Sequence, residues 1–384
     1  MKHDAKLPAE TLYMSNDTAN LVYPYPDHPD HGSTVEIAKG VYWLTMPLEG
    51  SLNHINLYLL EDTDGWYVVD TGWNDTRTMD LWRQIFATAL NDKPVKGVIC
   101  THMHPDHTGN ALAITDIFEC ELYMTQAEYY QARSFSSMFT QSGSNWHSEN
   151  FYHRAGMTSE ALELMQKGWA SRKEAGFSMP QMPQGYRRLC DGDNLQIGGS
   201  NWQIIVGSGH SPEHACLYNA SLGIMISGDQ ILPVITSNVS IHPSEPEANP
   251  LHDWMVSHDK FMSTPADTLI LPAHNLPFYG VRERLRDLVN HHEDRMLAIE
   301  EHCVNACVST ELLPVLFKRK LDGRQIMMAL GEAIAHIHLL MARNRIAREL
   351  RADGRYYYRS IDPDLERRAH TEDHDLPDDT PILV

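Results

Sequence analysis

The feature that most constrains this chain is the run His102, His104, Asp106 and His107 in THMHPDHTGN. It begins where the apolar stretch VKGVIC, residues 95–100, ends, and that stretch is typical of a buried strand. Side chains two apart in an extended segment point to the same side, so His102, His104 and Asp106 should converge. His107 follows as the chain turns into a helix and can reach a second, neighbouring point. Imidazole and carboxylate groups suit Zn, Fe or Mn, so the run predicts a metal site.

Three more candidate ligands occur far along the chain in the same situation, each shortly after an apolar strand-like stretch. They are His210 in GSGHSPEHA, Asp229 in ISGDQ and His274 in LPAHN. Glycines precede His210 and Asp229, as expected where the backbone must turn tightly to bring a side chain inward. One histidine among 22 is more often structural than a ligand, but seven such residues at four strand ends predict a shared metal centre.

The order His-x-His-x-Asp-His, then His, Asp and His, with VVDTG upstream, resembles the metallo-beta-lactamase superfamily over residues ~35 to ~280. The resemblance implies an α/β (α+β) fold, an αββα sandwich with its site at the sheet edges. It implies two divalent metal ions, with zinc the first choice and iron or manganese as alternatives. One ion is expected on His102, His104 and His210, the other on Asp106, His107 and His274, with Asp229 bridging and Asp70 buried behind the ligands. The motif PAHN departs from relatives, which commonly have glycine after the histidine; this leaves the ligand intact but alters the loop beside it.

Changes in pattern along the chain predict its organisation. Short β-type runs begin near Val35, helical spacing dominates residues 126–183, and residues 282–303, 310–319 and 324–342 read as helices before a hairpin turning at Asp353-Gly354. The C-terminal stretch resembles the winged-helix extension of a glyoxalase II-like hydrolase branch. The predicted units are an N-terminal arm (1–33), a metallo-beta-lactamase-fold domain (34–280) with a helical insertion (126–183), a winged-helix-like domain (281–360) and an acidic tail (361–384).

Charge and composition limit the classes of partner that the chain can bind. The net charge of −20 argues against nucleic acid or an anionic membrane as the main partner, and residues 281–360 carry only 14 Lys and Arg against 11 Asp and Glu. Neither a cleavable leader nor an uncharged apolar run of about 18 residues is evident, which predicts a cytoplasmic, non-membrane protein. The six cysteines are scattered and predict free thiols.

Several residues are candidates for roles around the metals. Asp106 and Asp229 are the predicted catalytic residues, because they would both bind metal and orient water. His54 and His214 are expected to be structural. Candidate substrate-binding residues are Asn238, His242, Asn275, Trp146 and Phe177.

The leading hypothesis is a metal-dependent hydrolase that cleaves an ester, thioester or lactone of a small organic acid, in which the helical insertion shapes the pocket. One alternative is a metal-dependent endoribonuclease of the same fold, whose Arg351, Arg355 and Arg359 would guide RNA. A second alternative is a non-catalytic metal-binding or assembly protein. The apolar faces of the C-terminal helices also suggest a homodimer.

Overall fold

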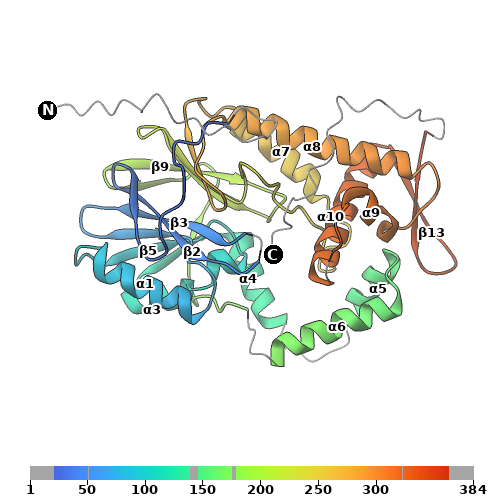
Figure 1. Ribbon diagram of the computed structural model, residues 1–384, viewed down its shortest axis with the longest axis horizontal. Coiled ribbons are helices and arrows are strands. Elements are labelled where there is room, and N and C mark those ends of the chain that lie inside the picture. Colours follow the sequence, from blue (N-terminus) through green and yellow to red (C-terminus); the bar gives the residue numbers. More distant parts are fainter. Residues whose placement is uncertain (1–20, 51, 139–145, 175–178, 322, 363–384) are drawn as a thin grey trace.

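Short runs rich in valine, isoleucine, leucine and aromatic residues form two β-sheets that pack face to face (Figure 1). The computed structural model describes residues 21–50, 52–138, 146–174, 179–321 and 323–362. Helices cover the outer face of each sheet, so the layers run helix, sheet, sheet, helix. The predicted αββα sandwich and α/β class are confirmed.

The first sheet has seven strands that lie side by side in chain order. They are β1 (Val35–Ala38), β2 (Val41–Pro47), β3 (His54–Glu61), β4 (Trp66–Val69), β5 (Val95–Ile99), β6 (Glu121–Thr125) and β7 (Arg187–Leu189). Strands β1 to β4 pair antiparallel, whereas β4 to β7 pair parallel. The carboxyl ends of parallel strands lie at one edge of a sheet. The run His102, His104, Asp106 and His107 follows β5 at that edge.

The second sheet has five strands in the order β12-β11-β10-β9-β8. They are β8 (Asn194–Ile197), β9 (Ser200–Gly207), β10 (His214–Asn219), β11 (Ile224–Gly228) and β12 (Leu269–Pro272). All neighbours are antiparallel except β11 and β12. Trp43 and Tyr58 of the first sheet meet Ile204 and Leu217 of the second, and each side chain is at most 2% exposed. Burying each such side chain contributes about 1.5–3 kcal/mol, so this layer fixes the two sheet edges relative to one another.

Helices join and cover these strands. They are α1 (Thr76–Thr88), α2 (Pro105–Thr108), α3 (Ala111–Phe118), α4 (Gln126–Met138), α5 (Trp146–Arg154), α6 (Ser159–Glu174), α7 (Pro250–Met262), α8 (Val281–His302), the 3₁₀ turn η1 (Ser309–Leu312), α9 (Leu313–Leu316) and α10 (Gly323–Ala342). Trp82 of α1 and Ile114 of α3 pack on the first sheet. Trp254 of α7 and Leu285 of α8 pack on the second.

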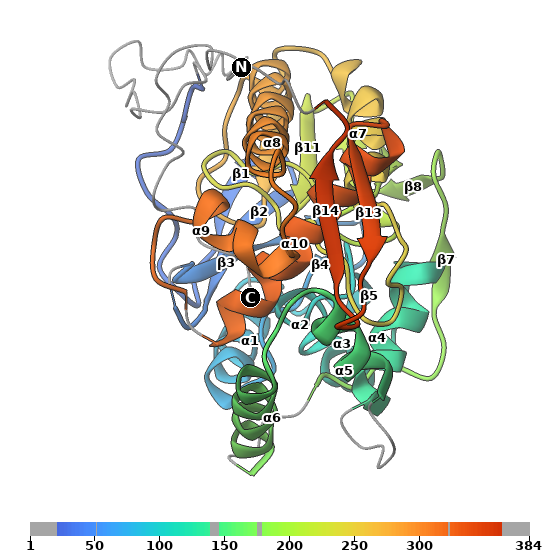
Figure 2. The same cartoon turned by 90° about the vertical axis from the view of Figure 1, so that its right-hand side faces the viewer.

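The C-terminal part contains α8, α10 and a hairpin of β13 (Ile346–Leu350) and β14 (Tyr356–Ser360), seen facing the viewer in Figure 2. The helix predicted at 310–319 is wrong in length, since only η1 and the single turn α9 form there. Pro314 lacks an N–H, and Phe317 is extended, with its ring 5.1 Å from the Arg295 guanidinium. One hydrophobic cluster joins α7, α8 and α10, so the domain boundary at residue 281 stays a prediction.

One helix in the described part of the chain is long and apolar enough to cross a membrane by length and composition. It is the stretch Gln325–Ala342 of α10, and 67% of it is buried inside the structure. It packs against α7 and α8.

The two segments outside the sandwich lie against other parts of the chain. In the N-terminal arm, Val22 forms a backbone bridge with Tyr279, while residues 1–20 lie outside the described residues. In the helical insertion, the Nε2 atom of His153 lies 3.1 Å from the carbonyl oxygen of Asp353 in the hairpin turn. Helix α5 therefore touches the C-terminal hairpin. The insertion was predicted to lie beside the site, and this contact was not predicted from the sequence.

Candidate metal centre

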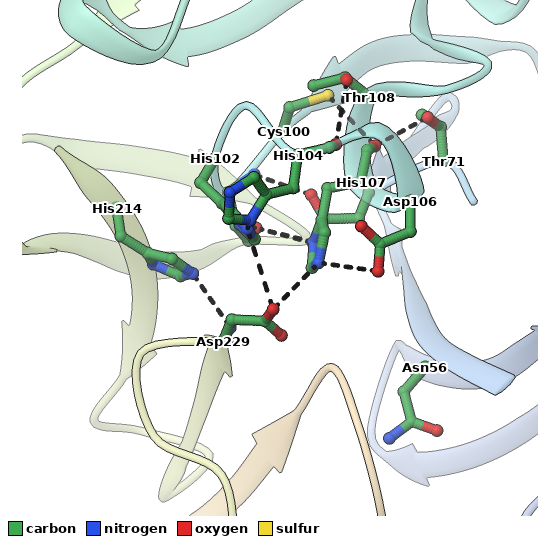
Figure 3. A network of polar contacts seen from close by, with 12 residues as sticks. Asn56, Thr71, Cys100, His102, His104, Asp106, His107, Thr108, His214 and Asp229 are labelled. Carbon is green, nitrogen blue, oxygen red and sulfur yellow. Dashed lines mark hydrogen bonds and ion pairs between the residues drawn. The ribbon is translucent and has the colours of Figure 1, made fainter. Parts of the chain in front are cut away.

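The seven predicted ligands meet at one edge of the sandwich, where the loops after β5, β9, β11 and β12 come together. Figure 3 shows His102, His104, Asp106, His107 and Asp229 among them. Their candidate ligand atoms form two groups, each with atoms within 4.8 Å of one another. The three-histidine group consists of His102, His104 and His210, with Asp229 beside it; the second group consists of Asp106, His107 and His274.

Nitrogen atoms face nitrogen atoms in the three-histidine group. The Nε2 atom of His102 lies 2.8 Å from Nδ1 of His104 and 3.2 Å from Nε2 of His210. Burial lowers the pKa of His104 to about 3, with a further lowering by the His210 ring, and it holds the pKa of His102 well below its usual range. Neutral imidazoles present lone pairs, so this group is suited to a cation at its centre.

The carboxylate of Asp229 lies between the two groups. Its Oδ2 atom is 3.4 Å from His210 Nε2 and 3.6 Å from His107 Nε2, while its Oδ1 atom is 3.4 Å from His274 Nε2. In the second group, Asp106 Oδ2 lies 3.5 Å from His274 Nε2 and 3.7 Å from His107 Nε2. A carboxylate that spans both groups is the geometry expected of a bridging ligand.

Unsatisfied polar atoms test whether cations fit here. His107 Nε2, His274 Nε2 and Asp229 Oδ1 are buried and make no hydrogen bond within the described structure. Their residues are at most 2% exposed. Buried polar atoms are nearly always satisfied, so three acceptors aimed at one point fit a site for positively charged ions.

Hydrogen bonds behind the rings orient their lone pairs toward the centre. The Nδ1–H groups of His107, His210 and His274 donate to Asp70 Oδ2 (2.8 Å), to the Asn238 carbonyl (2.8 Å) and to the His54 carbonyl (3.2 Å). In its neutral form, each ring therefore carries its proton on Nδ1 and presents a bare Nε2 to the cluster.

Asp70 organises the turn that bears the first ligands. It accepts the backbone N–H of Thr101 and the Thr101 hydroxyl, both at 2.8 Å, besides the His107 bond. The Thr101 oxygen in turn lies 3.1 Å from His102 Nδ1. The structure thus places Asp70 behind both groups, as the resemblance implied.

Two buried residues that the sequence analysis did not single out also hold the ligand loops. The Glu128 carboxylate accepts the N–H groups of Met103 (3.0 Å) and Glu213 (2.7 Å), and burial raises its pKa to about 7. The Asn56 amide donates to the carbonyls of Pro272 (2.9 Å) and Asn275 (2.6 Å), on either side of His274. An amide inside the apolar strand LNHINLYLL was a usable signal for Asn56, whereas Glu128 resembles any helical glutamate.

Glycine is required at the approach to His210. Gly209 has a φ of +101°, and a Cβ atom there would lie 2.3 Å from the Cβ of Trp254. Gly228, before Asp229, has a φ of +51° and would place a Cβ 2.5 Å from the His214 ring. The sequence prediction of tight turns before both ligands is confirmed.

We expect Gly209→Ala to lower the free energy of unfolding by roughly 3 kcal/mol, because backbone strain and overpacking add together. Gly199→Ala is the matched control. Gly199 has a φ of +70° with no atom within 4 Å of the added methyl, so only strain of about 1 kcal/mol should appear. Urea unfolding measures both; equal losses in the two variants would contradict the crowding argument.

The other predicted residues lie around or away from the cluster. His214 is fully buried and its Nε2 accepts the N–H of Asp229 at 3.0 Å, so its contact is with the backbone. The His54 ring lies 4.2 Å from that of His28. Asn275 has a φ of +65°, the left-handed conformation in which asparagine is the usual substitute for glycine. This explains how PAHN keeps the loop where relatives have glycine.

The remaining substrate candidates are less central. Asn238 contributes its carbonyl to His210, and its side chain points to α10. His242 is exposed. Trp146 lines a separate cavity of about 280 Å³ between α5 and the hairpin, and none of the seven ligands lines that cavity. Phe177 lies outside the described residues. Their roles toward substrate stay predictions.

Comparison with known proteins agrees with this geometry. Residues 50–274 match the model of the Metallo-beta-lactamase superfamily, and residues 296–361 match that of the Metallo-beta-lactamase-like, C-terminal domain. The solved structure of a beta-lactamase domain protein from Burkholderia ambifaria is 37% identical, with a TM-score of 0.81, covering 88% of this chain and 98% of that one.

Curated relatives are more distant. A probable metallo-hydrolase, YqjP of Bacillus subtilis, is 22% identical over 80% of this chain and 94% of its own length. The acyl-coenzyme A thioesterase MBLAC2 of Homo sapiens is 23% identical over 51% of this chain and 64% of its own length. The linear primary-alkylsulfatase of a Pseudomonas species is 23% identical over 64% of this chain and 46% of its own length.

Proposed function

The chain belongs to the metallo-beta-lactamase superfamily, and from that premise we propose that it is a two-metal hydrolase that cleaves an ester, thioester or lactone of a small organic acid. The observation that carries the proposal is the convergence of five histidines and two aspartates in two groups that share Asp229. A thioesterase among the relatives supports acyl transfer to water. An alkylsulfatase among them makes a sulfate ester the competing substrate class.

We assign the proposed ligands to two cations according to the two groups in which they lie. His102, His104 and His210 would hold one cation, Asp106, His107 and His274 the other, and Asp229 would bridge. When bound, such a pair of divalent ions supplies a nucleophile from water at neutral pH and polarises the carbonyl oxygen of the substrate. Zinc is the proposed ion, since imidazole and carboxylate ligands suit it; iron and manganese are alternatives.

The chain's own residues would then position the reactants. Asp229 and Asp106 each present a carboxylate oxygen to the space between the groups, where they can accept a hydrogen bond from the attacking water and orient it. Asp70 keeps His107 in the tautomer with a free Nε2. No nucleophilic side chain is needed in this arrangement. Water would add to the acyl carbon, the bond from that carbon to the alcohol or thiol would break, and the leaving group would take up the proton that the water gave up.

We expect the purified protein to contain two zinc ions per chain and to hydrolyse a thioester, a carboxylic ester or a lactone. Elemental analysis measures the metal, and a panel of a thioester, a carboxylic ester, a lactone, a β-lactam, an alkyl sulfate and an RNA oligonucleotide measures the reaction. Chelation should abolish turnover, and added zinc should restore it.

Each other outcome of this panel counts against the proposal. Cleavage of the β-lactam, the alkyl sulfate or the RNA alone would overturn the proposed ester, thioester or lactone substrate. Bound metal without turnover of any panel member would favour a non-catalytic metal-binding protein.

A further inference from the structure

A loop between β11 and α7 holds two of the proposed ligands from behind. We call residues 237–241 the backing loop. Its Asn238 carbonyl accepts the Nδ1–H of His210 at 2.8 Å. The Ser237 hydroxyl donates to the backbone carbonyl of Asp229. Any movement of this loop would therefore turn the His210 ring and shift Asp229.

Helix α10, in the C-terminal part of the chain, holds the backing loop in turn. The Asn238 side-chain amide donates to Glu332 Oε2 at 3.1 Å. The Ser240 hydroxyl donates to Asn238 Oδ1 at 2.5 Å, and its oxygen lies 3.1 Å from the Met328 carbonyl oxygen. The backbone N–H of Ile241 donates to the Gly331 carbonyl at 3.1 Å. A Cβ atom on Gly331 would lie 2.9 Å from the Ile241 carbonyl oxygen and 2.9 Å from Ser240 Cβ. Helix and loop are thus as close as their backbones allow.

A buried ion pair holds Glu332, the acceptor of the Asn238 hydrogen bond. Glu332 is 5% exposed and pairs with Arg295 of α8, which is 3% exposed. Burial raises the pKa of the Glu332 carboxyl, against the lowering by the Arg295 guanidinium. The ion pair with Arg295 holds the Glu332 side chain in place. The chain of contacts runs from Arg295 through Glu332 and Asn238 to His210.

We propose that α10 is part of the framework of the metal centre, and that Glu332 and Arg295 are positioning residues for His210. The inference rests on the proposed metal centre and adds a role for the C-terminal helices in it. Loss of this support should weaken cation binding mainly at the three-histidine group. His107 and His274 are held by Asp70 and the His54 carbonyl, neither of which belongs to α8 or α10.

A double variant separates positioning from stability. Arg295→Met/Glu332→Leu replaces the ion pair by apolar side chains. Proteins commonly stay folded after such a replacement of a buried ion pair. The change leaves the Asn238 amide without its acceptor. The matched control is Arg345→Met/Glu300→Leu. Glu300 is 4% exposed and pairs with Arg345 within the same C-terminal part, and neither residue is bonded to the backing loop.

Titration of the metal-free proteins with Co²⁺ and Zn²⁺, followed by absorption and by competition with a chromophoric chelator, gives the affinity of each site. His104→Ala, which removes one ligand of the three-histidine group, assigns the two steps. We expect the Arg295/Glu332 variant to lose ~10- to 100-fold in affinity at the three-histidine group, with an altered Co²⁺ spectrum, and to lose less at the second site, which contacts the backing loop only through the shared Asp229. The Arg345/Glu300 control should keep both.

Gly331→Ala gives a second test without a change in charge. Alanine favours the helix, so the fold should survive while the added methyl pushes the backing loop away, and the same site should weaken. Unchanged affinities in both test variants would overturn the inference, as would equal losses at both sites or in the control. Wild-type protein that binds no cation would instead refute the proposed metal centre, and this inference would fall with it.

Discussion

Replacing Asp229 with alanine is expected to remove both cations and to lower kcat/KM at least ~10³-fold. The reason is its position. Its carboxylate faces His210 of the three-histidine group and both His107 and His274 of the second group. Among the described residues, no other single side chain contributes to both groups in this way. Elemental analysis and hydrolysis of the substrate identified by the panel measure the two effects.

The control for this prediction is Asp80→Ala, which removes an exposed carboxylate paired with Arg83 on α1. Exposed ion pairs contribute about 0–1 kcal/mol, so metal content and turnover should stay unchanged. Circular dichroism shows whether the Asp229 variant keeps its secondary structure. A folded Asp229→Ala protein that retains two cations would contradict the bridging role.

The fold could be predicted because its strands carry a local signal. GVYWLTMP, INLYLLED and GWYVVDTG became β2, β3 and β4, and VKGVIC became β5. Such runs are buried on at least one face whatever their partners, so periodicity alone identifies them. The pairing of the two sheets carries no comparable local signal, and the resemblance to a known family supplied it.

The candidate ligands were accessible to sequence reasoning for a related reason. They are polar residues placed directly after buried strands, in the one position where a strand end can present them at a sheet edge. Two of the residues that hold them from behind, Glu128 and Glu332, were not accessible. Glu128 and Glu332 act across long sequence distances, on Met103 and Asn238, and only the packed structure shows which backbone each one meets.

The helical insertion shows that a predicted helix can have contacts that the sequence does not predict. Its helices were predicted, but their neighbours were not, because an amphipathic helix does not specify which apolar surface it will cover. Helix α5 contacts the C-terminal hairpin, and Trp146 lines a cavity beside Tyr356 and Tyr358. The predicted substrate role of Trp146 depended on a placement that sequence periodicity cannot supply.

Asp70→Asn is expected to weaken metal binding by ~10- to 100-fold, most at the group containing His107, and to lower the free energy of unfolding by roughly 2 kcal/mol. Asp70 accepts three hydrogen bonds, from the Thr101 N–H, the Thr101 hydroxyl and His107 Nδ1. An amide has one oxygen and a donating NH₂ group, so at least one of these donors would face another donor in a site that is 3% exposed.

Asparagine is the informative substitution because of the backbone. Asp70 has a φ of +60°, which asparagine adopts as readily as aspartate, so the change alters the hydrogen bonds and leaves the chain conformation in place. Asp92→Asn is the matched control, with a φ of +58° at an exposed position. Zinc competition and urea unfolding of both variants measure the two effects. If Asp70→Asn bound both ions as tightly as Asp92→Asn, the orientation of His107 would have to come from the metal itself and not from the carboxylate behind it.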